Sequence, residues 1–249
     1  MELRGKVALV TGGGTGLGRV ISLALAREGM DLAIVYSRRE AEANKTAGEL
    51  RGQGVKAIAV RADVSQPADV QALVDRVMAE YGRIDVLINN AGTTVFAPDF
   101  SDLEAISESD WDRVMAVNVK GPWMLSKTIG PIMKRQGQGR IIQTTSTAGV
   151  RAGGSSLIYT VSKAAEVQLT RGLAIALGPE VAVNAIAPGL IDTEWGHLWP
   201  DEHFKRMANN NALKRIASLE DCAAAVVFLA KNDSMTGQTI VIDGGGFFH

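Results

Sequence analysis

A tyrosine and a lysine spaced four residues apart, Tyr159 and Lys163, are the side chains of this sequence best suited to proton chemistry. On a helix, residues i and i+4 leave the same face one turn apart, so the two groups would be neighbours. A free phenol has a pKa of about 10, and a fixed cation beside it lowers that pKa. Such a pair can give a proton to a carbonyl or take one from an alcohol. The alternative is an ordinary exposed pair, since this spacing is common.

The segment that carries the pair is predicted to be helical, because residues 164–177 are rich in helix formers. Along the whole chain, short apolar runs alternate with amphipathic segments, which is typical of parallel strands joined by helices. The predicted fold class is α/β: a single Rossmann-type, doubly wound domain over residues 1–249, with about seven parallel strands and helices on both faces. The strands are expected at 7–10, 32–36, 55–60, 84–88, 140–146, 181–187 and 239–242.

A glycine-rich turn follows the first predicted strand and opens an amphipathic helix at 19–28. Glycines at 12, 16 and 18 let the backbone turn tightly and approach a pyrophosphate, which then lies at the positive end of the helix. The spacing differs from the strict GxGxxG fingerprint. The order of strand, turn and helix nevertheless predicts a dinucleotide site.

The end of the second strand indicates which dinucleotide is bound. Folds specific for NAD place an acidic residue there for the ribose 2′-hydroxyl, whereas this chain has Tyr36, Ser37, Arg38 and Arg39. The hydroxyl of Ser37 and the guanidinium of Arg38 can hold a 2′-phosphate. NADP(H) is therefore the expected cofactor. NAD(H) is the alternative, if the two arginines only begin a solvated helix at 39–52.

Polar residues also follow the third and fourth strands, at the edge where open α/β sheets bind ligands. Asp63 is expected to accept a hydrogen bond from an adenine amino group, unless it is only a turn aspartate. Ser65 is predicted to cap the next helix, with Pro67 in its first turn. Asn89, Asn90, Ala91 and Gly92 end the fourth strand and suit a backbone bend beside a ligand.

Asparagine is a poor residue inside a helix, and Asn118 falls within a long predicted helix. It predicts a local distortion there, with a satisfied buried amide as the alternative. Ser146 ends the fifth strand, thirteen residues before the tyrosine. Residues 190–212 follow the sixth strand and contain Trp195, Trp199 and Phe204; they are expected to form a substrate lid, although a packed excursion of the chain would have the same composition.

The composition excludes several classes of function. The chain has 249 residues, 46% of them hydrophobic and 21% charged, and a net charge of −1, so neither nucleic acid nor an anionic membrane is an expected partner. A single cysteine, Cys222, allows no internal disulfide. The three histidines do not have metal-ligand spacing, so no metal is expected. Neither a signal region nor an apolar run of membrane-spanning length is found, and a cytoplasmic location is expected.

These features together resemble the short-chain dehydrogenase/reductase family over nearly the whole chain. Within the family the sequence is similar to the bacterial 3-oxoacyl-[acyl-carrier-protein] reductase-like branch. It departs from many NADP-dependent relatives at Thr15, where they carry Arg or Lys, and the turn at 178–180 lacks the basic character expected for docking an acidic carrier protein. The resemblance rests on Thr11, Gly12, Gly16, Gly18, Asp63, Val64, Asn89, Asn90, Ala91, Gly92, Asn118, Ser146, Tyr159, Lys163, Pro188 and Gly189.

The resemblance implies a role for each catalytic residue. Tyr159 is expected to be the acid/base, and Lys163 to lower its pKa and bind the nicotinamide ribose. Ser146 is expected to hydrogen-bond the substrate oxygen, and Asn118 to hold a water in a proton relay behind the lysine. Asn90 is expected near the ribose, and Ile191 and Thr193 near the carboxamide or the phosphates. The full set of expected cofactor contacts is Gly12, Thr15, Gly16, Leu17, Gly18, Ser37, Arg38, Asp63, Val64, Asn90, Ala91, Gly92, Tyr159, Lys163, Pro188, Gly189, Ile191 and Thr193.

The expected function is hydride transfer between NADP(H) and a carbonyl or secondary alcohol, as in a ketone or 3-oxoacyl reductase. One alternative is an NAD-dependent alcohol, sugar or steroid dehydrogenase. Another, of a different class, is a nucleotide-sensing regulator that kept the fold and lost turnover. Relatives of this size imply a homotetramer or a dimer.

Overall fold

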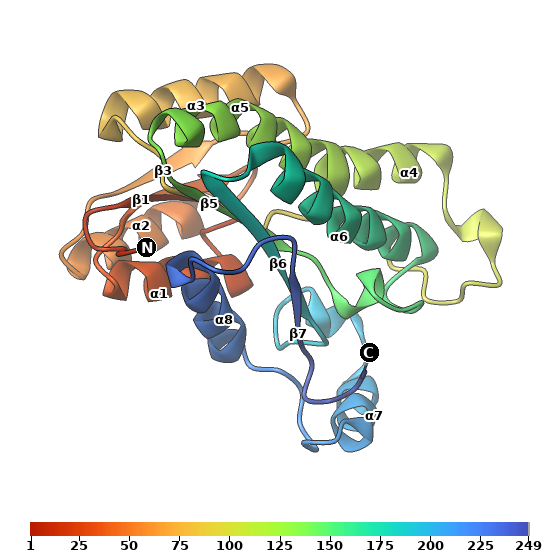
Figure 1. Cartoon of the computed structure of the whole chain (residues 1–249). Helices are drawn as coiled ribbons and strands as arrows, with labels where there is room; N and C mark the ends of the chain where they lie inside the picture. Colours follow the sequence, from red (N-terminus) through yellow and green to blue (C-terminus); the bar gives the residue numbers. More distant parts are fainter. Residues whose placement is uncertain (249) are drawn as a thin grey trace.

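The central sheet has seven strands, all parallel, in the order β3-β2-β1-β4-β5-β6-β7. The structure is a computed structural model that describes residues 1–248. The chain begins in the middle of the sheet, winds outward to β3, and returns to continue on the other side of β1 (Figure 1). This reversal between β1 and β4 opens a crevice at the carboxyl ends of the strands. The strands are β1 (Val7–Thr11), β2 (Asp31–Tyr36), β3 (Ala57–Arg61), β4 (Val86–Asn89), β5 (Gly139–Thr144), β6 (Val181–Pro188) and β7 (Thr239–Ile242).

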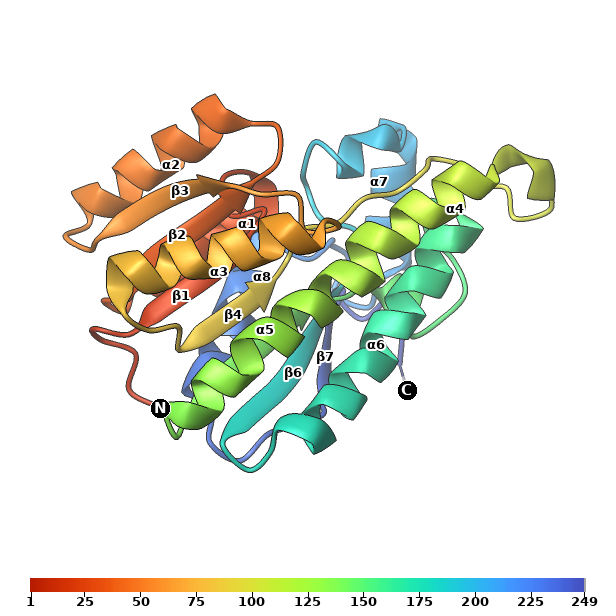
Figure 2. The same ribbon diagram turned by 90° about the horizontal axis from the view of Figure 1, so that it is seen from above.

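Helices cover both faces of the sheet (Figures 1 and 2). One apolar core joins the sheet to α1, α2 and α8, and a second core joins the opposite face to α3, α5 and α6. Strands buried on both faces are near-continuous apolar runs, as β1 is in this chain. The α-helices are α1 (Gly16–Arg27), α2 (Glu40–Gly52), α3 (Pro67–Tyr81), α4 (Glu108–Met115), α5 (Gly121–Arg135), α6 (Leu157–Leu177), α7 (Asp201–Asn210) and α8 (Leu219–Lys231).

Local expectations can be compared with these elements. The predicted α/β fold, with one parallel seven-stranded sheet and helices on both faces, is confirmed. The helix across the tyrosine and lysine is α6, which begins where the Ser156 hydroxyl accepts a hydrogen bond from the Tyr159 backbone N–H at 3.2 Å. The prediction that Ser65 caps α3 is wrong: Gln66 is the N-cap, and the Ser65 hydroxyl donates to Asp63 instead.

The distortion expected around Asn118 is present. One π-helical turn, Ala116–Lys120, joins α4 to α5 in a continuous helical segment. Such turns are frequent at functional sites, because they widen the helix by one residue and change where the following side chains point. Asn118 is buried in this turn, so both interpretations of the asparagine, distortion and buried amide, apply.

No helix within residues 1–248 combines the length and the hydropathy needed to cross a membrane. The same residues contain no group of three or more His, Cys, Asp or Glu side chains placed to hold a metal ion.

Candidate active site

Tyr159 and Lys163 lie on the inward face of α6 and line a cleft above the carboxyl ends of the strands. The Lys163 ammonium lies 5.7 Å from the centre of the phenol ring. It donates a hydrogen bond to the backbone carbonyl of Thr144, at the end of β5, at 2.9 Å. Ser146, two residues further along the chain, lines the same cleft as Tyr159, and its side chain acts to lower the pKa of the phenol. The three side chains predicted to act together are therefore assembled in one place.

The electrostatics of this cluster differ from the sequence expectation. Burial raises the pKa of the Tyr159 phenol, and the attraction of Lys163 and the polar side chain of Ser146 lower it by less. The net pKa is above the usual value of a phenol. Lys163 does act in the predicted direction; burial, which the sequence pattern does not report, outweighs it.

A third ionisable side chain, Glu166, belongs to the same helix face and was absent from the sequence prediction. Its carboxylate lies 2.7 Å from the Lys163 ammonium, and its side chain is almost completely buried. Burial raises the pKa of Glu166 to about 7, with Lys163 acting in the opposite direction. Burial alone lowers the pKa of Lys163, but the neighbouring Glu166 and Tyr159 more than offset this, and the pKa lies above its usual value.

Asn118 lies behind the cleft and does not line it. Its side-chain oxygen accepts from the Thr93 N–H at 2.8 Å, while its amide nitrogen donates to the Thr93 carbonyl at 2.9 Å and to the Ser162 hydroxyl at 3.0 Å. The side chain therefore ties the segment after β4 to α6. This is a positioning contact, and it holds one wall of the cleft against the helix that carries Tyr159.

The glycine-rich turn is packed too closely for side chains. A Cβ built on Gly18 would lie 2.1 Å from the Gly12 carbonyl oxygen and 2.6 Å from the side-chain nitrogen of Asn90. Gly12 and Gly16 have φ of +64° and +49°, which side chains disfavour. Asn90 donates to the Thr11 carbonyl at 2.9 Å, so its side chain fastens β4 to the turn. The backbone of the turn is thus held in place and left bare on its cleft side.

The amino end of α1, which is the positive end of the helix dipole, directly follows this turn and has no negative side chain in its first turn. Thr15 is the N-cap but makes no side-chain capping hydrogen bond, and the first turn of the helix contains no acidic residue. Backbone N–H groups and the helix dipole are then available to an anion such as a pyrophosphate. The residues present therefore fit the phosphates of a dinucleotide.

The end of β2 is more basic than the sequence pattern alone indicated. Arg61, at the end of β3, pairs in register with Tyr36 and lines the cleft together with Ser37 and Arg38. Arg39 is held by Glu194 from the segment after β6, at 2.5 Å. A carboxylate is also present nearby, because Glu40 of α2 is close enough to Tyr36 to raise the pKa of its phenol. Arg38 and Arg61 thus line the cleft with cationic groups at the ends of β2 and β3.

Asp63 lines the cleft but is used in its own turn. Its carboxylate accepts from the Ser65 N–H at 2.9 Å and from the Ser65 hydroxyl at 2.7 Å. The alternative interpretation, that Asp63 is a turn aspartate, therefore describes its hydrogen bonds. Its side chain is nevertheless exposed to the cleft. The segment after β6 also reaches the glycine turn. A Cβ placed on Gly16 would lie 3.7 Å from the Thr193 methyl group.

The cleft has a volume of about 1420 Å³, larger than the roughly 300–1,000 Å³ of a usual small-molecule pocket. It therefore has room for a dinucleotide and a second ligand. Every cofactor-binding residue expected from the sequence lines it, as do Ser146, Tyr159 and Lys163; Asn118 alone among the expected site residues does not.

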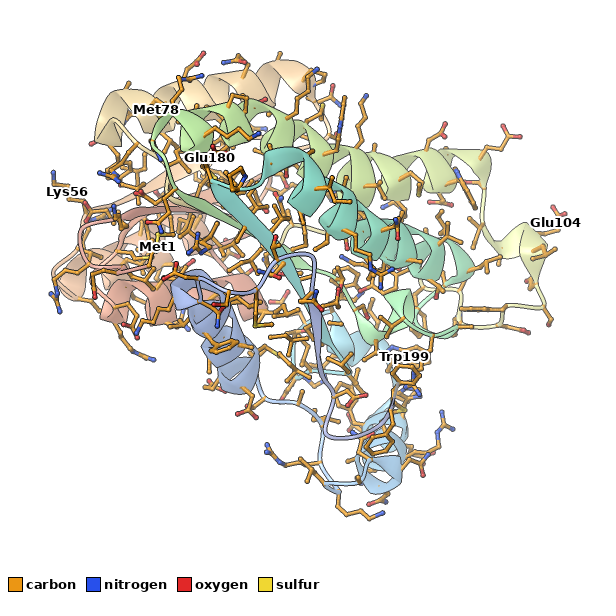
Figure 3. The ribbon with its side chains drawn as sticks, viewed as in Figure 1. Met1, Lys56, Met78, Glu104, Glu180 and Trp199 are labelled. Atoms are coloured by element: carbon orange, nitrogen blue, oxygen red, sulfur yellow. The ribbon has the colours of Figure 1, made fainter. Side chains whose placement is uncertain are left out.

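Aromatic side chains from residues 190–212 cover one end of the cleft. The Trp195 ring meets the Tyr159 ring edge to face at 5.6 Å between centres. Trp199 lies just before α7 (Figure 3). Its ring stacks on His203, with 3.9 Å between ring centres, and meets the Phe96 ring edge to face at 5.0 Å. The sequence pointed to this cluster as a group of aromatic residues, but not to its contact with Tyr159.

Glu166 and Arg61 could have been found from sequence by position alone. Glu166 is three residues after Lys163 and seven after Tyr159, on the same helix face. Arg61 is the last residue of a strand next to β2. Both were overlooked because a single charged residue on a helix or at a strand end usually faces solvent.

The chain matches known proteins over nearly its whole length. A family model described as enoyl-(acyl carrier protein) reductase matches residues 12–246. A protein of Streptomyces violaceoruber named as a ketoacyl reductase of the granaticin polyketide synthase is 40% identical over 243 residues, which are 96% of this chain and 95% of that protein.

Solved structures of other proteins are also similar to this chain in sequence and in fold. A short-chain dehydrogenase from Burkholderia cenocepacia in complex with NADP is 34% identical, with a TM-score of 0.90 over 99% of both chains. A 3-ketoacyl-(acyl-carrier-protein) reductase from Brucella melitensis complexed with NADH is 31% identical, with a TM-score of 0.89 over 98% of this chain and 99% of that one.

Proposed function

Because the chain belongs to the short-chain dehydrogenase/reductase family, we propose that it is an oxidoreductase that transfers hydride between NADP(H) and a carbonyl or secondary alcohol. In the direction of reduction it acts on a ketone or a 3-oxoacyl compound. The observation that carries the proposal is the convergence of Ser146, Tyr159 and Lys163 in the wall of the cleft that the bare glycine turn also lines.

These residues supply the proton chemistry. A bound nicotinamide would supply the hydride. The Tyr159 phenol gives its proton to the carbonyl oxygen as that oxygen gains charge. Ser146 hydrogen-bonds the same oxygen, and the Lys163 ammonium stabilises the phenolate left on Tyr159. In alcohol oxidation the same proton returns to Tyr159.

We propose that the phosphates lie on the backbone of Gly12–Gly18 and the amino end of α1, with Asn90, Ala91 and Gly92 and the residues from Pro188 to Thr193 along the ribose and nicotinamide. The arrangement supports NADP(H) over NAD(H), because Ser37, Arg38 and Arg61 line the cleft at the end of β2 and β3. NAD(H) remains the second candidate: one similar structure holds NADP and another holds NADH.

The substrate end of the cleft favours an apolar carbonyl compound. Trp195 packs on Tyr159, and Trp199 and Phe96 meet above the same end, which supports residues 190–212 as a lid over the substrate. The relative named as a ketoacyl reductase is consistent with this class. The turn 178–180, Gly-Pro-Glu, has no basic residue, so we propose a small ketone or a free thioester in preference to a substrate attached to a carrier protein.

We also propose that the protein is a homotetramer, or failing that a dimer, assembled through α4, α5 and α6. These helices expose large apolar side chains, including Trp111, Trp123 and Ile175, of which Ile175 is 87% exposed. Apolar side chains exposed on these neighbouring helices support a subunit contact there, because contiguous apolar surface marks interaction sites. Light scattering on the purified protein measures the mass, and a Trp123→Glu variant is expected to form smaller assemblies.

The proposed function is tested on a panel of ketones, 3-oxoacyl and enoyl thioesters and sugars, with NADPH and NADH compared by absorbance. We expect carbonyl reduction with NADPH, and a loss in kcat of at least about 10²-fold in Tyr159→Phe, the scale of one general acid, while NADPH still binds. Tyr81→Phe is the matched control, since the Tyr81 hydroxyl bonds the Leu32 carbonyl away from the cleft.

A fully active Tyr159→Phe enzyme would refute the assignment. Binding of NADPH with no turnover of any substrate in the panel would instead favour the nucleotide-sensing regulator. A preference for NADH in the unmodified protein would overturn the NADP(H) assignment and favour the alcohol, sugar or steroid dehydrogenase.

A further inference from the structure

Glu166 is a buried carboxyl group in direct contact with Lys163, and the mechanism above gives it no role. It projects from α6 three residues after the lysine, its exposed fraction is 1%, and one of its oxygens lies 2.7 Å from the lysine nitrogen. Lys163 is equally enclosed, at 3% exposure. Acidic side chains are almost never this buried without a specific partner.

The two charges depend on each other. Among residues 1–248, Lys163 is the only charged group that acts on the Glu166 carboxyl, and none of the charged residues on the neighbouring α4, α5, β5 or β6 contributes to its pKa. The groups that act on Lys163 are Glu166 and Tyr159, besides the Thr144 carbonyl to which it donates. The ammonium therefore has one carboxylate as its counter-ion.

The surroundings are polar but uncharged. Asn118 enters from the π-helical turn between α4 and α5. On the sheet, Asn89 and Gln143 are register partners, and alternation places both on the face that α5 and α6 cover, in line with Leu87 and Ile141. Both amides are buried, without a hydrogen-bond partner in the described part of the chain. Neutral amides cannot replace the carboxylate as a counter-ion.

A buried ammonium without a counter-ion gives up its proton readily, because burial disfavours the charged form. Burial acts on Lys163 in this direction, and the carboxyl of Glu166 is the strongest of the groups that oppose it. Without the carboxylate, either Lys163 loses its charge or the Tyr159 phenol loses its proton at a lower pH. The first change removes the cation that stabilises the phenolate left on Tyr159, and the second removes the proton donor itself, so either one lowers the rate of carbonyl reduction from the alkaline side.

We propose that Glu166 is a positioning residue for the reaction: it holds Lys163 charged and fixed behind the Tyr159 phenol, and thereby sets the upper pH limit of carbonyl reduction. This inference rests on the proposed function. It assigns to α6 a triad of Tyr159, Lys163 and Glu166, in which the carboxylate acts through the lysine and touches neither substrate nor cofactor.

The test is the pH profile of kcat for NADPH-dependent reduction in the full-length enzyme. In Glu166→Gln, which keeps the shape and removes the charge, we expect the alkaline limb to move to lower pH by about one unit, the lower end of what a nearby charge does. The rate on the acid side should change little. Glu166→Asp keeps the charge at a greater distance and should move the limb in the same direction by less.

Thr170→Val is the matched control. Thr170 is buried one turn further along the same face of α6, and its hydroxyl bonds the Glu166 backbone carbonyl and not the side chain. This variant should leave the alkaline limb where it is in the unmodified enzyme. If Glu166→Gln does not fold, the smaller shift in Glu166→Asp remains the measurement.

The inference is overturned if both Glu166 variants lower the rate by the same factor at every pH, or leave the profile unchanged, since either result means a purely structural role. Its failure is distinct from that of the proposed function: an active Tyr159→Phe enzyme, or no turnover of any substrate, removes the function and this inference together. An inactive Tyr159→Phe with an unshifted Glu166→Gln profile removes only the inference.

Discussion

Replacing Gly18 by alanine adds one methyl group to the turn that we propose holds the cofactor phosphates. The new Cβ would lie 2.1 Å from the Gly12 carbonyl oxygen and 2.6 Å from the Asn90 side-chain nitrogen, whereas real Cβ atoms essentially never come closer than 3.0 Å. The turn must therefore open by about 0.9 Å at the oxygen, the difference between 3.0 and 2.1 Å. That movement also strains the hydrogen bond from Asn90 to the Thr11 carbonyl.

The expected magnitude follows from these contacts. Forcing a methyl group into a packed site costs about 1–3 kcal/mol, and a weakened hydrogen bond adds about 1 kcal/mol. The better helix propensity of alanine returns at most about 1 kcal/mol. The net loss of about 2 kcal/mol corresponds to a fall in Tm of about 4–8 °C for a chain of this size. The displaced turn should also weaken NADPH binding by at least about tenfold, or about 1.4 kcal/mol.

Gly48→Ala is the control with the opposite sign. Gly48 is an exposed position inside α2, and a Cβ there would meet only the end of the Arg51 side chain, at 3.9 Å. The same substitution should stabilise the protein by about 0.5–1 kcal/mol and leave NADPH binding unchanged. Thermal unfolding and a fluorescence titration with NADPH measure both effects. Gly18→Ala that is as stable as Gly48→Ala and binds NADPH as tightly would refute the reasoning.

Three further predictions concern the charged and aromatic walls of the cleft. The pKa of Glu166 is raised from 4.5 to about 7 on folding, so the stability that its protonated form contributes is present below about pH 4.5 and is lost as the pH rises through about 7. Relative to Glu166→Gln, the unmodified protein should lose about 3 kcal/mol of unfolding free energy over that window. Parallel pH profiles of Tm for the two proteins would contradict this. Arg38→Ser should lower the ratio of kcat/KM for NADPH to kcat/KM for NADH by at least about tenfold, because a phosphate contact is lost. Arg39→Ser should lower this ratio less, because the native Arg39 is already paired with Glu194. Equal effects of the two substitutions would contradict the assignment. Trp195→Ala should raise the KM for the carbonyl substrate by about tenfold, because the ring contact with Tyr159 is lost. The Kd of NADPH should stay the same. An unchanged KM would argue against residues 190–212 as a substrate lid.

Sequence reasoning was most successful where one residue type has one physical use. The glycines at 12, 16 and 18 predicted a tight turn, and that turn has positive φ angles at Gly12 and Gly16 and, at Gly18, a Cβ position that would overlap a carbonyl. Asn118 indicated a helix distortion, and a π-helical turn is present. Ser65 was predicted as the N-cap of α3 from its residue type. The backbone conformation, which the sequence does not show, makes Gln66 the N-cap instead.

It was least successful where burial decides the outcome. Tyr159 and Lys163 were correctly placed on one helix face, and Lys163 lowers the phenol pKa as predicted. Burial raises that pKa by more, and the extent of burial depends on what packs over the ring. The partner of Lys163 was missed for the same reason. Glu166 is an ordinary residue in the sequence, and it becomes a buried counter-ion only because the sheet and the π-helical turn close over that side of α6.

The sequence by itself determined the order of strands and helices, the glycine turn and the helical spacing of Tyr159 and Lys163, since these depend on residues that are neighbours along the chain. The tertiary structure alone decided which groups far apart along the chain touch: Arg61 beside the end of β2, the Trp195 ring against Tyr159, and Glu194 paired with Arg39. It also decided the charge balance around Lys163. The physical reason is that desolvation and electrostatic pairing depend on distance in space, which the crossovers of a doubly wound sheet set between residues far apart in sequence.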